Sequence, residues 1–288
     1  MSAFREWSKA FREEGLNITA ADLSVQERAL LRVSAEETRH QQNREAIAAG
    51  AVREFTHARL DQFSEVGSKL DDEWVDRFWR LAQDVSDAQV QSLWARILAR
   101  QSAGTAKCSA RCLEALSLLS PSEATLLERI ATMTTLAEAG GVSKSIIVLS
   151  LSDYRTGGVS ASDAQELQRA NRRVVDYVGD LHSEIFGQIG IFIDDGWGHE
   201  LAGIVGNQTV DVSIGQHPYG IEGYPVQLPQ NPNLRIPDAV YIGNGTQLSP
   251  LGSEIIGLIQ TEPDKEYVKL LGDALSHTGL RLAPGVPR

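Results

Sequence analysis

The residues best suited to chemistry lie in one glycine-rich stretch of the chain. Asp194, Asp195 and His199 fall within the run Asp-Asp-Gly-Trp-Gly-His-Glu, and His217 follows in the next turn region. Carboxylates and imidazoles on such loops can bind a cation or transfer protons. We therefore predict a candidate metal site made of these four residues, for which a divalent cation is the one candidate cofactor. The alternative is a β-hairpin turn, because Asp-Gly is by itself a strong hairpin signal.

The two cysteines are a weaker candidate for a metal site. Cys108 and Cys112 are separated by three residues, and no second pair accompanies them. Because a structural zinc site takes four ligands, we interpret them as free thiols near the start of a helix. The sequence also lacks a phosphate-binding loop, a G-x-S-x-G nucleophile elbow and an H-E-x-x-H zinc motif. No cofactor is predicted beyond that cation, and these absences favour a protein without enzymatic activity.

Composition and charge restrict the partners. The 288-residue chain is 42% hydrophobic and 23% charged, which is typical of a globular protein with a core. Its net charge is −11, and both halves are acidic, whereas a nonspecific nucleic-acid binder needs Lys and Arg to neutralise phosphates. The start of the chain is too polar for a signal peptide, and no apolar run reaches the length of a membrane span. We expect no membrane partner and a cytoplasmic location.

The first half of the chain, residues 1–140, is predicted to be an all-helical domain. Its long first helix covers about residues 24–63, a span without proline and with only one glycine, Gly50. The middle of this helix is wholly polar, and we predict an interaction site there, formed by Arg39, His40, Gln42, Asn43 and Arg44. A polar middle indicates either an exposed arm, stabilised by a partner or by a second copy, or a break between two ordinary helices. In both cases we expect His40 to be exposed.

Residues 71–139 carry the clearest helix signals and are predicted to form a helical core. Asp71 or Asp72 can cap a first helix, and Ser86-Asp87-Ala88-Gln89 fits a capping box before a second. Large aromatic residues recur here at helical spacing. By their burial preferences they are expected to be core rather than a ligand site: Trp74, Phe78, Trp79 and Trp94.

The second half, residues 141–288, is predicted to be a mixed α+β domain. Residues 142–160 fit either a strand or a helix, and two closing helices are expected over 249–278. Between them, short β-branched runs separated by glycine and proline predict a small antiparallel sheet over about residues 189–242. The runs are Ile189–Ile193, Gln208–Ile214, Tyr224–Leu228 and Ala239–Ile242. The fold class is therefore α+β, with an all-helical domain followed by a small antiparallel sheet flanked by helices.

The helical core resembles an uncharacterised family of bacterial proteins. Its shared pattern, V-S-D-x-x-x-Q-x-L-W-A-x-I-L-A, is carried by the run from Val85 to Ala99, and the segment from Ser109 to Ala124 resembles the next two helices of that family. Arg100-Gln101 stands where the family usually has Gly-Glu. A similar helical core occurs in the abortive-infection alpha proteins. The resemblance brings no catalytic motif and implies an association with defence against phage or mobile elements.

We therefore expect a non-enzymatic interaction or sensor protein of bacterial defence, which acts through oligomerisation or a protein partner. One alternative is a metal-dependent hydrolase that uses the loops from Asp194 to His217. Another is a DNA-binding regulator of winged-helix type that uses Ser249–Ile259 or Pro263–Ser276. The acidic charge weighs against the regulator, since Lys265 and Lys269 are the only basic residues on the last predicted helix.

Overall fold

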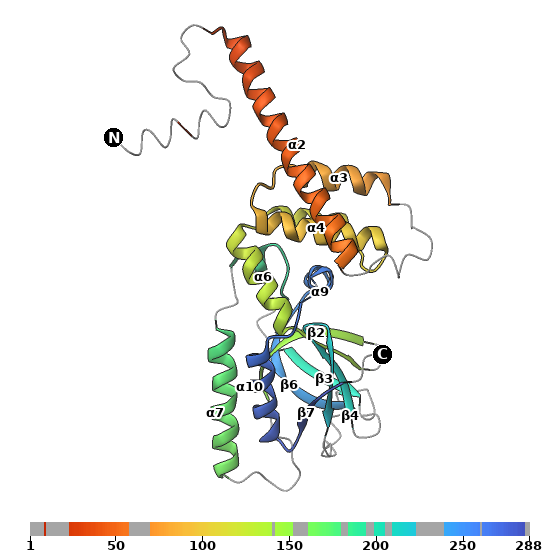
Figure 1. The fold of residues 1–288 in the computed structure, drawn as a ribbon. Helices are drawn as coiled ribbons and strands as arrows, with labels where there is room; N and C mark the ends of the chain where they lie inside the picture. Colours follow the sequence, from red (N-terminus) through yellow and green to blue (C-terminus); the bar gives the residue numbers. More distant parts are fainter. Residues whose placement is uncertain are drawn as a thin grey trace, which may run out of the picture. The chain divides into compact units, whose positions relative to one another are not determined.

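The chain divides into two compact units, residues 1–121 and 122–288, and each is described by itself. The computed structural model describes residues 9, 23–57, 70–139, 142–151, 161–179, 184–193, 199–204, 209–222, 239–259 and 261–285. Within that part of the chain, unit 1 is helical, whereas unit 2 holds one sheet with its own helices (Figure 1). This is the α+β class expected from the sequence.

Helix α2 dominates unit 1. It runs without a break from Val25 to His57, which is 33 residues. The sequence predicted a helix over about 24–63, of which residues 58–63 lie outside the described part. The polar middle does not mark a break, because its side chains find partners in the α3–α4 connection. Although α2 has the length of a membrane span, no helix in the described residues combines that length with sufficient apolar character.

Three shorter helices complete the described part of unit 1, and each begins at a side chain that accepts a hydrogen bond from its first turn. They are α3 (Asp72–Ala82), capped by Asp71, α4 (Ala88–Ala103), capped by Asp87, and α5 (Ala110–Ser117), capped by Ser109. The capping box predicted at Ser86 is wrong by one residue. The Asp87 carboxylate accepts the backbone N–H groups of Gln89 and Val90, at 3.0 and 3.1 Å, so the carboxylate takes the role expected of the Ser86 hydroxyl.

An aromatic cluster forms the core of unit 1. The rings of Trp74 and Phe78 stack with centroids 5.2 Å apart, and Trp94 meets Phe78 edge to face at the same separation. All three side chains are buried. Trp79 lies at the border of this core, half-exposed, with its ring edge-on to Phe78 at 5.1 Å. Such large apolar bodies contribute most of the burial that holds short helices together.

Unit 2 is built around an antiparallel sheet whose described strands follow the order β3-β6-β2-β1-β4-β5-β7. The strands are β1 (Thr135–Ala139), β2 (Val142–Ser150), β3 (His199–Ile204), β4 (Thr209–Ile214), β5 (His217–Glu222), β6 (Ala239–Gln247) and β7 (Arg281–Pro284). The helices are α6 (Pro121–Met133), α7 (Ala161–Val178), α8 (Glu184–Gln188), α9 (Pro250–Leu258) and α10 (Lys265–Ser276). Helix α10 packs against α7 and β7.

The end of the predicted helical core is different in the structure. Residues 135–139, expected to be helical, form β1 and pair with β2 from Thr135↔Ile146 to Ala139↔Val142. The division expected at residue 140 therefore falls between two paired strands, and the compact units divide after Pro121 instead. The reason lies in the β-branched pair Thr134-Thr135, which suits a strand better than a helix. The ambiguous segment after residue 141 is the strand β2.

The predicted strand Ile189–Ile193 is also corrected. Its residues follow α8 in a turn at Gly190, which has a φ of 79°, and only Phe192 pairs, in a single bridge to Leu248. The rings of Phe186 and Phe192 meet at 6.2 Å, so an apolar run that reads as a strand is buried as a compact turn. Strands β4 and β6 match predicted runs, β3 and β5 were not predicted, and Tyr224–Leu228 lies outside the described residues.

The two closing helices form as expected. Ser249 caps α9 with Pro250 at its first position, and Asp264 caps α10. Tyr267 then ties α10 to the sheet, because its buried hydroxyl donates to the carbonyl of Val148 and accepts from the N–H of the same residue, both at 3.0 Å. Burial raises the pKa of Tyr267, which stays a neutral donor at physiological pH.

Candidate interaction site on helix α2

The second half of α2 lies in the interior of unit 1. One face carries all of the buried residues of this helix: His40, Asn43, Ile47 and Ala51. They recur every three or four residues and pack on α4. The approach is close at Gly50, where a Cβ would lie 2.7 Å from the Cβ of Ala95. Glycine is therefore required sterically at this crossing, although it is a poor helix former.

Asn43 is the centre of a buried polar network. Its amide nitrogen donates to the backbone carbonyl of Gln83 at 2.7 Å and to the Ser86 hydroxyl at 3.2 Å. Its amide oxygen accepts from Gln91 at 3.1 Å, and the same Gln91 nitrogen donates to the carbonyl of Val85 at 2.8 Å. The side chain thus satisfies the backbone of the α3–α4 connection, which no apolar residue could do.

His40 is buried as well, so the expectation that it would be exposed is wrong. Only 8% of the residue is accessible, and its Nε2 lies 3.1 Å from a carboxylate oxygen of Asp84. Arg44 reaches Glu37 at 3.2 Å and also donates to the side chain of Gln83. Of the five predicted interaction residues, His40 and Asn43 are internal, Arg39 and Arg44 are half-buried, and Gln42 is exposed.

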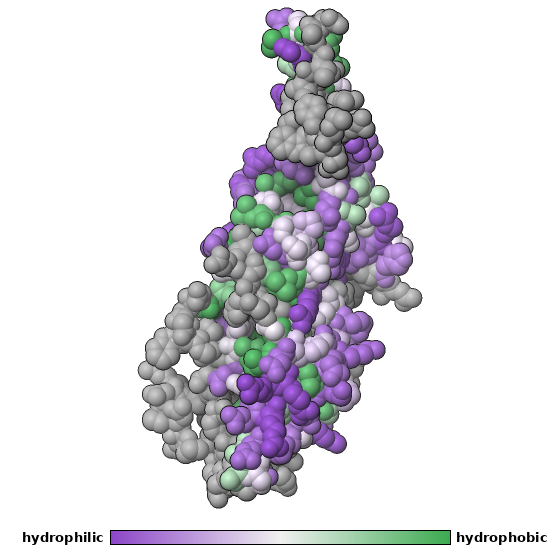
Figure 2. All heavy atoms as spheres, turned by 90° about the vertical axis from the view of Figure 1, so that its left-hand side faces the viewer, coloured by the Kyte–Doolittle hydropathy of each residue, from purple (hydrophilic) through white to green (hydrophobic). Residues whose placement is uncertain are grey.

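The first half of α2, in contrast, exposes its apolar side chains. Its large apolar residues are exposed, with 72% of Val25, 70% of Leu30, 50% of Leu31 and 51% of Val33 accessible. The helix stands clear of α3, α4 and α5 over this half (Figure 1), and Figure 2 shows hydrophobic residues among hydrophilic ones at the upper end, where α2 begins. We name residues Val25–Glu36 the arm.

The arm continues the buried face of the same helix. Counted from the N-terminus, the face passes through Val25, Ala29, Val33 and Glu36 before it reaches His40. The spacing of four, four, three and four residues keeps one side of an α-helix. A shallow groove lies beside it, lined by Leu30, Val33, Ser34, Glu37, Thr38, Gln41 and Gln42. In the first half, no element in the described part of the chain fills the seam that α4 fills in the second half.

The arm has a well-formed beginning. Ser24 and Glu27 cap each other: the Glu27 N–H donates to the Ser24 hydroxyl at 3.2 Å, and the Ser24 N–H donates to the Glu27 carboxylate at 2.8 Å. The hydrogen bonds from Ser24 lower the pKa of Glu27. This is a capping box, and the S-x-x-E spacing that marks it is readable in the sequence. The arm therefore begins at a defined cap, although it lacks a tertiary partner on its apolar face in the described residues.

The predicted metal residues are not brought together in the described part of the chain. Asp194 and Asp195 lie outside the described residues, and only the backbone of His199 is described, at the start of β3. His217 starts β5, which is not a neighbour of β3 in the sheet. Its Nε2 lies 3.4 Å from Glu262, and it belongs to no group of three potential metal ligands among the described side chains.

A tight hairpin accounts for the position of His217. Gly215 and Gln216 link β4 to β5 with positive φ values of 54° and 67°, which is the geometry of a two-residue hairpin turn. The Gln216 side chain donates to the carbonyls of Ile256 and Ile259, at 2.9 and 3.0 Å. These contacts fasten the turn to the end of α9, and the hairpin thereby fixes where His217 begins β5.

The two helices considered for DNA binding, α9 and α10, pack into the core of unit 2. In α9 the buried side chains include Leu251, Ile255 and Leu258, and in α10 they include Leu271 and Leu275. The basic residue Lys269 pairs with Glu266 at 3.0 Å on the same helix. Neither helix presents a row of cations, and these contacts give a DNA-binding regulator no support.

Comparison with known proteins identifies a family. A family model described as a protein of unknown function (DUF2806) matches residues 27–181. The match runs from the arm of α2 past the end of α7, and it covers slightly more than half of the chain. No curated protein and no solved structure matches the chain.

Proposed function

Because the chain belongs to the family of proteins of unknown function DUF2806, whose description assigns no activity, we propose a function from the geometry of α2. The protein is a non-enzymatic interaction protein that assembles through the arm, and the occupant of the open seam is the arm of a second copy. The observation that carries this proposal is the exposed apolar face of the arm, which continues a face that is buried farther along the same helix.

A helix without tertiary packing is marginal in water. Isolated helices of about 12–15 residues gain little from hydrogen bonds alone, and most helices are stabilised by burial of an apolar face. Val25 and Val33 leave that face in water over the arm, and Leu30 is exposed in the groove beside it. Covering it would remove apolar area from solvent, which contributes about 25 cal/mol for each Å² buried. The arm therefore gains stability from any complementary helix.

A second copy meets this need without charge repulsion. Residues 25–39 carry three arginines and three glutamates, so the exposed part of α2 has no net charge. Arg32 and Glu36 lie 2.7 Å apart on the exposed surface, and such pairs can exchange partners between helices at little cost. Two arms can thus pair through their apolar faces while their flanking charges alternate, as in a short coiled coil.

The biological setting is proposed from the resemblance of the helical core to abortive-infection alpha proteins. In this proposal the protein acts in the cytoplasm in defence against phage or mobile elements, and assembly of the arms is the active step. The two parts are separable, since assembly is a property of the purified chain and defence is a property of the cell.

Assembly is tested by measuring mass in solution. We expect the wild-type protein to be a dimer or larger by light scattering and sedimentation velocity, and a variant with Val25→Ser, Leu30→Ser and Val33→Ser to be a monomer. Val52→Ser is the matched control, because Val52 is on the same helix and 67% exposed but lies off this face. A monomeric wild type across the accessible concentration range, or a triple variant that assembles normally, would show the proposal to be wrong.

Defence is tested in cells. Phage are expected to form fewer plaques on bacteria that express the wild-type protein or the Val52→Ser control than on bacteria that express the triple arm variant. Equal plaque counts for the wild type and an empty vector over a broad phage panel would contradict the defence role and leave the assembly result as it stands. Protection by a variant that does not assemble would separate assembly from function.

A further inference from the structure

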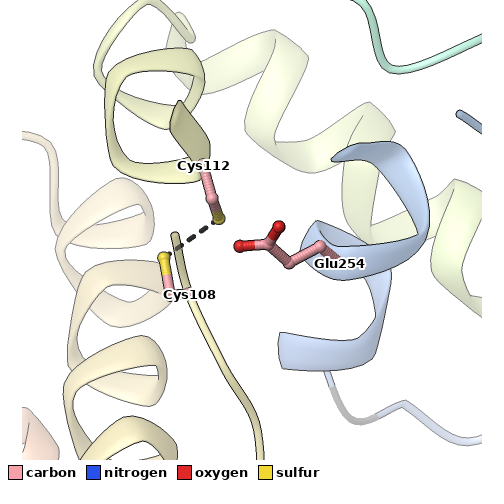
Figure 3. Close-up of side chains that lie close together, drawn as sticks. All are labelled: Cys108, Cys112 and Glu254. Carbon is pink, nitrogen blue, oxygen red and sulfur yellow. Dashed lines mark hydrogen bonds between the residues drawn. The ribbon is translucent and has the colours of Figure 1, made fainter. Parts of the chain in front are cut away.

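The two cysteines of unit 1 lie much closer than their sequence spacing requires. Cys108 precedes α5 and Cys112 lies in its first turn, and the two sulfur atoms are 3.0 Å apart (Figure 3). Neither cysteine is in a disulfide, and Cys108 is 3% exposed while Cys112 is fully buried. Glu254, also drawn in Figure 3, belongs to unit 2, and the cysteine pair is described within unit 1 alone.

The backbone of Cys108 is held from two neighbouring helices. Its carbonyl accepts a hydrogen bond from the indole nitrogen of Trp74 at 2.7 Å, and its N–H donates to the side chain of Gln101 at 2.7 Å. Trp74 is on α3 and Gln101 is on α4, so tertiary contacts rather than the local chain set this position. Fixing two reactive groups in this way raises their effective concentration.

The position of Cys112 is set by the cap of α5. The Ser109 hydroxyl accepts the backbone N–H of Cys112 at 3.1 Å, which makes Cys112 the third residue of the helix. The first turn of a helix favours negative charge, because its N–H groups point toward the N-terminus. The Cys108 thiol donates toward the Cys112 sulfur, which is the arrangement of a thiol beside a nucleophilic sulfur.

We propose that Cys108 and Cys112 are a reversible thiol–disulfide pair that a small peroxide oxidises. A disulfide requires the sulfurs to approach to about 2.05 Å, a closure of about 1 Å from their separation in the reduced protein. A structural zinc ion would take four ligands, and unit 1 supplies only these two in its described part. The pair therefore suits a bond between its members better than a metal.

The reaction balances in two steps. The Cys112 thiol loses its proton, and the thiolate attacks one oxygen of hydrogen peroxide. The O–O bond breaks, Cys112 becomes a sulfenic acid, and the hydroxide that leaves takes up the proton that Cys112 lost and becomes water. The Cys108 sulfur then attacks the Cys112 sulfur, the S–O bond breaks, and the hydroxyl leaves with the Cys108 proton as a second water. The two thiols are oxidised by two electrons and the peroxide is reduced to two waters. Because both sulfurs are buried, only an oxidant of this size is expected to react quickly.

The experiment uses the full-length protein. It is reduced, treated with a small excess of hydrogen peroxide, quenched in acid, unfolded and alkylated, and its intact mass is measured. We expect the mass to fall by two hydrogen atoms, both cysteines to escape alkylation, and dithiothreitol to restore both reactive thiols. The emission of the tryptophans is expected to shift at the same rate, because Trp74 bonds directly to Cys108.

Cys108→Ser and Cys112→Ser are matched controls, since each keeps the shape of the site and removes one sulfur. With Cys108→Ser, the sulfenic acid on Cys112 has no partner and is expected to react with dimedone, whereas the wild type is not labelled. Addition of oxygen to the wild-type mass, two thiols that remain reactive after peroxide, or a co-purifying metal ion that protects both cysteines from alkylation would overturn the proposal. Thermal unfolding of both variants checks that they fold.

Discussion

The two halves of α2 reverse the usual relation between polarity and burial. Val25, Leu30 and Val33 in the first half are more than half exposed, whereas His40 and Asn43 in the second half are buried. Val25 and Val33 lie on the same side of the unbroken helix as the buried residues His40 and Asn43, and Leu30 lies beside that face. What differs is the neighbour: α4 and the α3–α4 connection cover the second half, and no described element covers the first.

The contrast shows how a polar position becomes part of a core. Asn43 is buried because it supplies hydrogen bonds that the backbone at Gln83 would otherwise lack. An apolar side chain in that place would leave a buried carbonyl unpaired, at a cost of about 1–3 kcal/mol. An exposed valine leaves no buried polar group unpaired and carries no comparable penalty, which is compatible with the proposed assembly through the arm.

The largest difference between the halves is expected for apolar truncation. Ile47→Ala should lower the free energy of unfolding of unit 1 by about 2–5 kcal/mol, because Ile47 is fully buried and a cavity remains. Leu30→Ala should change it by less than about 0.5 kcal/mol under conditions where the protein is monomeric. Urea unfolding followed by circular dichroism measures both. Equal losses would mean that the arm is packed in the monomer.

A smaller difference is expected for the polar middle. Asn43→Ala removes the hydrogen bonds that Asn43 donates to the Gln83 carbonyl and the Ser86 hydroxyl, and the one that it accepts from Gln91. Because these partners are left unpaired inside unit 1, the free energy of unfolding should fall by about 2 kcal/mol. The neighbouring exposed Gln42→Ala should stay within about 0.5 kcal/mol of the wild type. Thermal melting of the two single variants compares them. A neutral Asn43→Ala would contradict the buried network.

The smallest difference is expected for the ion pairs. Glu54 lies 3.8 Å from the buried Arg100, and Glu36 lies 2.7 Å from the exposed Arg32. Burial lowers the pKa of Arg100, and the charge of Glu54 opposes this shift. Glu54→Gln should therefore cost about 1–2 kcal/mol, but Glu36→Gln only about 0.3–0.5 kcal/mol despite its shorter contact.

The salt dependence of these two variants sharpens the comparison. Raising the ionic strength should remove the effect of Glu36→Gln, because exposed charges are screened, and leave most of the effect of Glu54→Gln. The measurement is the shift of the urea midpoint at low and high sodium chloride. If both effects disappear in salt, the pair in the second half is open to solvent.

Much of the local structure could be read from the chain. The cap at Asp71 could be predicted because its carboxylate and the N–H group of Trp74 that it accepts lie only three residues apart, so the local spacing alone indicates where the helix begins. The strand β1 was missed because its five residues follow a helical stripe directly, and only their pairing with β2 makes them a strand. The same limit hid β5, whose register depends on β4 and β7.

The sequence by itself determined the α+β class, the helical character of the residues that form α2, and the polar character of its middle, because these follow from spacing over neighbouring turns; that α2 runs without a break was decided by the tertiary structure. Only the tertiary structure decided that Asn43 is inside and Val25 outside, and that two sulfurs four residues apart face each other at 3.0 Å. Whether a face is buried depends on which segment, distant in the sequence, packs against it. The local spacing of residues along one helix does not specify that segment.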